Sequence, residues 1–363
     1  MSDIAADRQT ILRGARDRLA GFARAFFRTP LVAAINIAAL ALIALAVPPI
    51  VDWAILDAVW TGATGAACPP DAGACWTFIA HKYRLILFGR YPFDEQWRPL
   101  AATVLLLAMT GASCWPTFWT RRLLAAWPVA LALYALLMWG GVLGLSFNPT
   151  TYWGGLPLTV LLSVLGIVIG FVVSVPVALG RRSRMPVIRV FCTAYIELVR
   201  GVPLISILFL ASVVLPLFLP DGFTPSGLVR VLAGIVFFFA AYMAEVLRGG
   251  LQAIPRGQYE AASSLGLGYM ATMWKVILPQ TFELVLPAMV NLFIGAIKGT
   301  SLVVIIAMMD LLGAAQAALA DPNWIGFYVE AYVFAGAIYV LLCSAVSWYG
   351  RKTERRLRTM RGR

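Results

Sequence analysis

The sequence predicts an all-α integral membrane protein with about eight transmembrane helices. Of its 363 residues, 61% are hydrophobic and only 13% are charged, whereas soluble domains carry about 25% charged residues. Long uncharged stretches recur along the chain, and a helix of roughly 20 apolar residues is enough to cross the hydrocarbon core of a bilayer. The basic residues also gather in alternate loops, which is typical of membrane proteins.

Charged residues and one turn signal bound the predicted spans. Arg28 and Asp52 enclose the first apolar stretch, whereas the uncharged stretch 123–180 is too long for a single span. The sequence Asn-Pro-Thr-Thr at 148–151 is a turn signal that divides this stretch into two. The eight predicted spans are 31–51, 99–118, 123–145, 156–180, 198–219, 228–248, 285–311 and 329–350.

The net charge of +12 is compatible with a nucleic-acid partner, but the distribution of the basic residues favours a membrane. If the N-terminus lies inside, 22 of the 29 Lys and Arg residues fall on predicted cytoplasmic segments and 5 on predicted external ones. This asymmetry obeys the positive-inside rule. We therefore expect no nucleic-acid partner, a lipid bilayer as the main environment, and both termini in the cytoplasm.

The spans and loops divide the chain into four predicted regions, with the main boundary near residue 150. They are a basic cytoplasmic N-terminus (1–30), three accessory spans with an external loop at 52–97 (31–150), a five-span core with a long cytoplasmic loop at 249–284 (151–350), and a basic cytoplasmic tail (351–363).

Two of the five cysteines, Cys68 and Cys75, share the predicted external loop. An oxidising compartment would permit a disulfide between them, and the sequence leaves open whether one forms. His81 is the only histidine, and we predict no metal site.

The predicted cytoplasmic loop carries signals for two short helices. Pro255 suits a helix start, residues 258–265 form two turns, and Gly266 suits the left-handed position that ends a helix. A second short helix is expected over 269–278, ending at Pro279.

This loop resembles the EAA loop of ABC-importer permeases. The family pattern is EAA-x3-G-x9-I-x-L-P, and only its isoleucine is replaced here, by Val276. The resemblance implies that the loop docks in a cleft of a cytoplasmic ATPase and transmits its closure to the spans. The residues that would couple the two proteins are Glu260, Ala261, Ala262, Gly266, Leu278 and Pro279.

Flanking motifs narrow the resemblance to the polar-amino-acid branch of these permeases. They are Ile-Glu-Leu-Val-Arg-Gly-Val-Pro-Leu at 196–204, Ala-Glu-Val-Leu-Arg-Gly-Gly at 244–250 and Lys-Gly-Thr-Ser-Leu at 298–302. In the last motif Gly299 stands where Asp is common in the family. The similarity covers about residues 155–350.

The accessory spans and the stretch 88–99 look like the longer permeases of general L-amino-acid uptake systems, which work as heterodimers. The resemblance therefore implies a five-helix permease core and the import of polar L-amino acids, with broad specificity, from the periplasm across a bacterial inner membrane. It also implies a second homologous permease subunit and a periplasmic amino-acid-binding protein as partners.

The chain has no Gly-x4-Gly-Lys-Ser/Thr phosphate-binding loop. It is therefore not expected to be an enzyme or to bind a cofactor itself. The resemblance implies that ATP and magnesium bind to a partner ATPase, present in two copies.

Two charge pairs are candidate gates near the cytoplasmic ends of spans. Glu197 and Arg200, like Glu245 and Arg248, stand three residues apart and can pair on one helix face. The alternative to a gate is a local pair that neutralises charge at the membrane edge.

Lys298 is the leading candidate for the substrate pathway, together with Asn291, Thr300 and Ser301. It falls about halfway along the predicted span 285–311, where an unpaired lysine facing lipid is unfavourable. We expect it to face the bundle interior or the partner permease. A structural pair with a carboxylate is the alternative.

An ion-gradient-driven secondary transporter is the main rival hypothesis. Such a protein would place carboxylates deep within several spans, and here Asp310 is the only plausible example. A membrane-embedded enzyme would need a catalytic constellation that the sequence does not offer.

Overall fold

The computed structural model describes residues 26–69, 71–220 and 224–361, and within this part of the chain it is helical, with no β-strand. The predicted all-α fold is confirmed. Most of the predicted N-terminal region, residues 1–25, lies outside the described residues, as do residues 362–363 of the predicted tail. The chain divides into two compact units, 1–77 and 78–363, and each is described by itself.

The described part of the first unit, from residue 26 on, contains one long apolar helix and a small cross-linked loop. Helix α2 (Pro30–Val51) begins where Thr29 Oγ1 accepts a hydrogen bond from the Val32 amide at 3.2 Å, with Pro30 in the first turn. A π-helical turn, η1 (Asp52–Leu56), continues it. In the loop that follows, the structure joins Cys68 to Cys75 in a disulfide, with Cα atoms 6.0 Å apart.

Among the residues that the structure describes, six helical segments are long and apolar enough to span a membrane. They are 30–56, 121–139, 155–181, 227–253, 269–306 and 328–357. A seventh candidate is a pair of helical segments, α7 (Pro186–Arg200) and 204–218, which meet at an angle of 107°. The predicted number of eight spans is not confirmed, since the helix in the predicted span 99–118, α4 (Trp97–Ser113), has only 17 residues.

The predicted span 198–219 is wrong at its start. Helix α7 begins at Pro186, where proline suits the first turn, and ends at Arg200. Gly201 and Pro203 then interrupt the helix before α8 (Leu204–Phe209). The sequence 196–204, expected as the start of one span, is therefore the corner between two helices.

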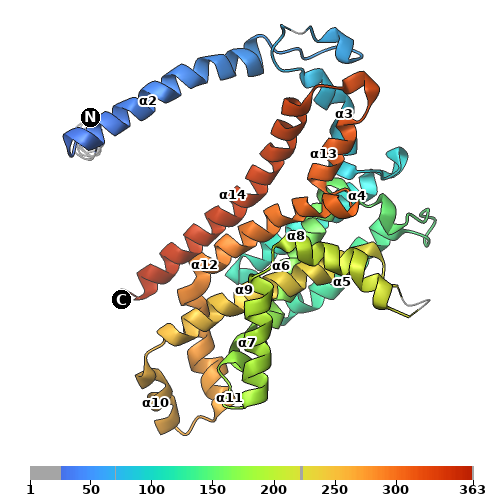
Figure 1. The fold of residues 1–363 in the computed structure, drawn as a ribbon. Helices are drawn as coiled ribbons and strands as arrows, with labels where there is room; N and C mark the ends of the chain where they lie inside the picture. Colours follow the sequence, from blue (N-terminus) through green and yellow to red (C-terminus); the bar gives the residue numbers. More distant parts are fainter. Residues whose placement is uncertain (1–25, 70, 221–223, 362–363) are drawn as a thin grey trace, which may run out of the picture. The chain divides into compact units, whose positions relative to one another are not determined.

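Helices α6 (Gly155–Arg181) and α9 (Gly227–Ala253) pack along each other in the core of the second unit (Figure 1). Gly166 lies directly against Ile235, and Gly170 faces the backbone of Ala240 on α9. Small residues four apart allow helices in a membrane to approach closely. This seam is the centre of the main hydrophobic cluster, which also includes side chains of α4, α5 (Arg121–Trp139) and α12 (Leu278–Gly299).

The predicted helix 269–278 and the predicted span 285–311 are both corrected. Helix α11 (Tyr269–Thr272) continues through a π-helical turn, η8 (Met273–Ile277), into α12, because Pro279 occupies the first turn of α12. Helix α12 ends at Gly299, and a 3₁₀ segment, η9 (Thr300–Ile306), follows. Ala307, with φ +60°, then turns the chain into α13 (Leu311–Leu319).

Helix α14 (Tyr328–Arg361) is the last helix and the longest α-helix of the described residues, and it packs against α12 and α13.

A cluster of polar contacts surrounds Glu95, in the short 3₁₀ segment η3 (Phe93–Glu95) that leads into α4. There the Glu95 carboxylate accepts hydrogen bonds from Arg98 Nη1 at 2.6 Å, from Asn148 Nδ2 at 2.7 Å and from the Ser146 hydroxyl. These contacts tie the start of α4 to the segment that follows α5.

Candidate coupling surface and transport pathway

Helix α10 (Arg256–Ser264) is a short exposed helix with a well-defined end. Pro255 precedes it, and Gly266 follows with φ +72°, so the predicted left-handed position is confirmed. The Leu267 amide donates to the Ala262 carbonyl at 3.1 Å, and the Gly266 amide donates to the Ser263 carbonyl at 2.9 Å. These two bonds form a Schellman motif, which fixes the direction in which the chain leaves α10.

Three spans are connected to α10. It follows α9 and precedes the continuous helix that contains α11 and α12. At the end of α6, Arg182 Nη1 donates to the Leu251 carbonyl at 2.7 Å and lies 3.3 Å from the Tyr259 hydroxyl. Gln280 Nε2 on α12 donates to Gln258 Oε1 on α10 at 3.1 Å. Helix α10 is therefore joined to α9 and α12 through the chain and in contact with side chains of α12 and of the end of α6.

The residues expected to couple this chain to an ATPase separate into two groups. Glu260 and Ala261 are exposed on α10, whereas Ala262 is buried against the protein. Leu278 is buried and Pro279 is exposed in the first turn of α12. Thus the structure gathers the first part of the motif on α10 and places its last two residues at the start of a span.

An apolar surface adjoins α10. Its members are strongly exposed although they lie in a polar loop: Leu265 is 79% exposed, and Tyr269, Met270 and Trp274 are each more than half exposed. A hollow of about 460 Å³ lies beside α10, lined in part by Arg182, Tyr259 and Glu260. Helices α10 and α11 lie together at one end of the second unit (Figure 1), so this surface is open to a partner.

The candidate charge pairs form one cluster across three helices. Glu245 on α9 accepts bonds from Arg248 at 2.7 and 2.9 Å, so this predicted pair is present. Arg200 lies 3.6 Å from the same carboxylate. Glu197 instead pairs with Arg181 on α6, at 2.5 Å, and Arg181 also contacts Glu245, at 2.6 Å. The sequence interpretation missed Arg181, because residue spacing reveals only neighbours on the same helix.

Lys298 lies in the last turn of α12 rather than halfway along an uninterrupted α-helix, because α12 changes to the 3₁₀ segment η9 after Gly299. Both elements belong to the candidate spanning segment 269–306. The side chain of Lys298 is exposed, and it forms no ion pair with a carboxylate within the described part of the chain. Asn291, two turns earlier, is exposed as well. A Cβ added to Gly295, between them, would meet no atom within 4 Å. These three residues mark an open face of α12.

Thr300 and Ser301 differ from these three residues, because their hydroxyl groups are bonded to backbone carbonyls of α12. Ser301 Oγ donates to the Lys298 carbonyl at 2.7 Å. Thr300 is fully buried; its hydroxyl donates to the Ile297 carbonyl at 2.8 Å and lies 3.5 Å from the Tyr339 hydroxyl. Both side chains thus stabilise the end of α12 through local backbone contacts.

A buried polar centre at Asp310 was not predicted as a site. Asp310 caps α13 by accepting from the Gly313 amide at 2.9 Å, and it accepts from the Tyr339 hydroxyl on α14 at 2.7 Å. Thr159 on α6 accepts from the Leu311 amide at 3.0 Å. Asp before the apolar run 311–319 is an N-cap signal that could have located the start of α13.

A helical bundle with several apolar spans and an exposed short helix tied to three of them has the architecture of a membrane permease. Residues 166–359 match the family described as binding-protein-dependent transport system inner membrane component. The chain belongs to this family, and it is a multi-pass permease subunit of an ABC transporter.

Three relatives place the chain within the family. It is 45% identical to the inner membrane amino-acid ABC transporter permease protein YhdY of Escherichia coli K12, over 87% of this chain and 86% of that protein. It is 32% identical to the glutamate/glutamine/aspartate/asparagine transport system permease protein BztC of Rhodobacter capsulatus, over 84% and 86%. A probable amino-acid ABC transporter permease protein, YckA of Bacillus subtilis, is 32% identical over 56% of this chain and 87% of its own length.

Proposed function

We propose that this permease subunit imports polar L-amino acids, with broad specificity, from the periplasm to the cytoplasm. The names of the relatives support amino acids as the cargo, and BztC is named for four polar ones. The observation that carries the mechanism is α10, an exposed helix with a fixed end and direct contacts to the spans.

In this proposal a separate cytoplasmic ATPase, present in two copies, binds ATP and magnesium and hydrolyses the nucleotide. Its closure moves α10, and the movement passes to α9 and α12 through the chain and to α6 through the contact of Arg182 with Tyr259. The exposed apolar side chains beside α10 support this site, because interfaces are enriched in aromatic residues and methionine.

The charge cluster is the proposed cytoplasmic gate. Glu245 holds arginines from α6, α7 and α9 together, so a relative movement of these helices has to break or exchange contacts at one carboxylate. Removing one member of such a network leaves the remaining charges unpaired. We expect Glu245→Gln to raise ATP hydrolysis in the absence of substrate.

The substrate pathway is proposed to run along the open face of α12 at Asn291, Gly295 and Lys298. A second, homologous permease subunit would cover this face and complete the path, and a periplasmic binding protein would deliver the substrate. The exposed Lys298 ammonium is suited to a substrate carboxylate.

The proposed orientation places both termini and α10 in the cytoplasm, and the loop at 52–97 in the periplasm. The disulfide between Cys68 and Cys75 supports this orientation, since disulfides persist in oxidising compartments. In a background without Cys114, Cys192 and Cys343, a thiol at Ser263 should react with an impermeant reagent only after cell lysis. A thiol at Thr64 should react in intact cells, and the opposite pattern would reject the orientation.

Purification of the complex with its ATPase is the test of the proposed function. In vesicles that contain the complex, a polar amino acid and its binding protein should stimulate ATP hydrolysis and enter only when ATP is present. Uptake that persists without ATP and stops when an ionophore dissipates the ion gradient would favour the secondary transporter instead.

A further inference from the structure

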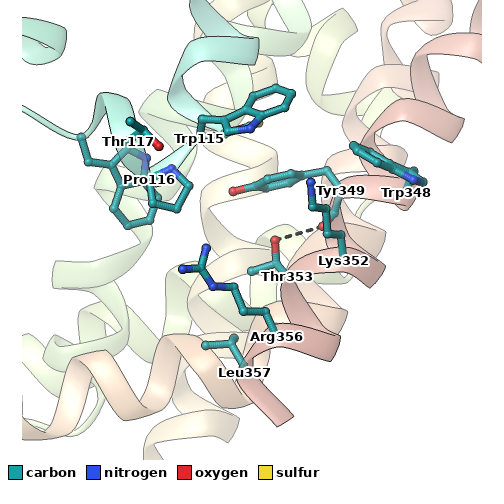
Figure 2. A pocket seen from close by; sticks show the side chains of 11 residues that line it. Trp115, Pro116, Thr117, Trp348, Tyr349, Lys352, Thr353, Arg356 and Leu357 are labelled. Carbon is teal, nitrogen blue, oxygen red and sulfur yellow. Dashed lines mark hydrogen bonds between the residues drawn. The ribbon is translucent and has the colours of Figure 1, made fainter. Parts of the chain in front are cut away.

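A pocket of about 450 Å³ lies between an accessory loop and the last helix, within the second unit (Figure 2). One wall is η4 (Pro116–Phe118) with its neighbour Trp115, and the other is the end of α14. Figure 2 shows Trp115, Pro116 and Thr117 facing Tyr349, Lys352 and Arg356. The pocket is distant in sequence from α10 and from the open face of α12, and the proposed transport mechanism does not use it.

The chemistry of the lining is both aromatic and cationic. Lys352 Nζ lies 5.6 Å from the centre of the Trp115 ring and 5.0 Å from that of Trp348, so two aromatic faces hold the ammonium group at the pocket. The Arg356 side chain points toward the η4 wall (Figure 2). No lining residue is acidic, and within the described residues neither cation forms an ion pair with a carboxylate.

The position of the pocket indicates the level of the lipid headgroups. The apolar stretch 331–350 ends where Trp348 and Tyr349 line the pocket, and Lys352 and Arg356 follow within two turns. Tryptophan and tyrosine are enriched at membrane–water interfaces, and basic pockets between transmembrane helices bind anionic headgroups. Trp119, 65% exposed, extends the aromatic wall outward, where acyl chains would lie.

We propose that this pocket binds the headgroup of one anionic phospholipid. Lys352 and Arg356 contact the phosphate, and the Thr117 hydroxyl is available to a remaining headgroup oxygen, whereas the Thr353 hydroxyl donates to the Tyr349 carbonyl. The tryptophan rings pack against the upper acyl chains. The lipid would thereby join the accessory helices to the last helix of the core. Another occupant, a basic segment of protein, would be repelled by the two cations.

Native mass spectrometry of the assembled complex tests the proposal, with phosphatidylglycerol and phosphatidylcholine of identical acyl chains as probes. Phosphatidylglycerol should bind more tightly, and Lys352→Gln combined with Arg356→Gln should weaken it by about thirtyfold, given the typical contribution of each basic residue at a membrane surface. Arg351→Gln combined with Arg355→Gln is the matched control. These substitutions remove the same charge from the same helix, but neither residue lines the pocket.

Three results would overturn the proposal. Equal losses in the two double variants would indicate diffuse attraction to the charged tail rather than a site. Displacement of phosphatidylglycerol by millimolar inorganic phosphate would indicate a site for a soluble anion. Lipid binding to the isolated chain but not to the assembled complex would indicate that the pocket is covered by the partner permease. Retained binding in the control pair and loss in the pocket pair would support the lipid site.

Discussion

Two glycines, one in the core seam and one at the coupling helix, serve opposite physical purposes. A Cβ at Gly166, between α6 and α9, would lie 2.6 Å from Ile235 Cγ2, whereas a Cβ at Gly266 would meet no atom within 4 Å. Position 266 requires glycine for a different reason: its φ is +72°, and residues with a Cβ are disfavoured in this left-handed conformation. The seam between α6 and α9 therefore leaves no room for a side chain at Gly166, whereas the turn after α10 needs a residue that tolerates a positive φ. A substitution should affect folding in the first region and partner contact in the second.

The largest expected effect is that of Gly166→Leu. The added side chain has no space beside the buried Ile235, and overpacking a core typically costs about 1–3 kcal/mol. We expect a lower unfolding temperature and a reduced yield of the assembled complex, measured by thermal unfolding in detergent and by size-exclusion chromatography. Gly336→Leu is the matched control, because Gly336 also lies in a spanning helix but its Cβ would meet no atom within 4 Å. Equal effects at both positions would show that the seam is not specially close-packed.

Gly266→Val should abolish transport while leaving the protein inserted in the membrane. A β-branched residue in the left-handed region costs on the order of 1–2 kcal/mol, which would distort the end of α10 and weaken its contact with the ATPase. The measurements are amino-acid uptake and recovery of the ATPase with the permease. Gly249→Val, also exposed but on α9 and without a positive φ, should retain transport. Normal uptake by Gly266→Val would eliminate α10 as the coupling element.

Lys298→Met should leave stability and assembly unchanged but abolish uptake, because it keeps the side-chain volume and removes the charge. The exposed position and the lack of a carboxylate partner within the described residues favour this outcome over a structural role. Basal ATP hydrolysis and uptake are measured on the same preparation. Loss of the assembled complex would favour a structural pair with the partner permease, and full uptake would exclude a pathway role.

The smallest expected effect is a pH dependence at the Glu95 contacts, which lie in neither region. The hydrogen bond from Ser146, with those from Asn148 and Arg98, lowers the pKa of the Glu95 carboxyl. A lowered folded-state pKa means that these contacts stabilise the protein above the unfolded pKa of about 4.3 and lose their effect as pH falls through the folded value. The difference in unfolding temperature between wild type and Glu95→Gln should be constant from neutral pH to about pH 5 and shrink below about pH 4. A difference that shrinks already near pH 6 would contradict this assignment.

The structural features that were predicted correctly depend on local sequence, and those that needed correction depend on contacts between distant segments. The sequence alone predicted the all-α membrane fold, most of the spans, and the turn at Gly266, because apolar length and a left-handed glycine are local properties. It also predicted the pairing of Glu245 with Arg248, since residues three apart on a helix are neighbours. Each of these features depends on residues close together in the chain.

Only the tertiary structure decided which groups meet across helices and where long helices break. Arg181 joins Glu197 to Glu245 although the three belong to different helices, and Lys298 lies near the end of α12 because the α-helix changes to the 3₁₀ segment η9 after Gly299. The helical path itself ends beyond η9, at Ala307. Distant helices hold the turn that follows, since the Tyr339 hydroxyl on α14 donates to Asp310 and Thr159 on α6 accepts from the Leu311 amide. Where a helix ends inside an apolar segment, its freed backbone and side-chain polar groups must find hydrogen-bond partners. Here helices distant in the sequence supply those partners, so the sequence of the segment alone does not reveal the end.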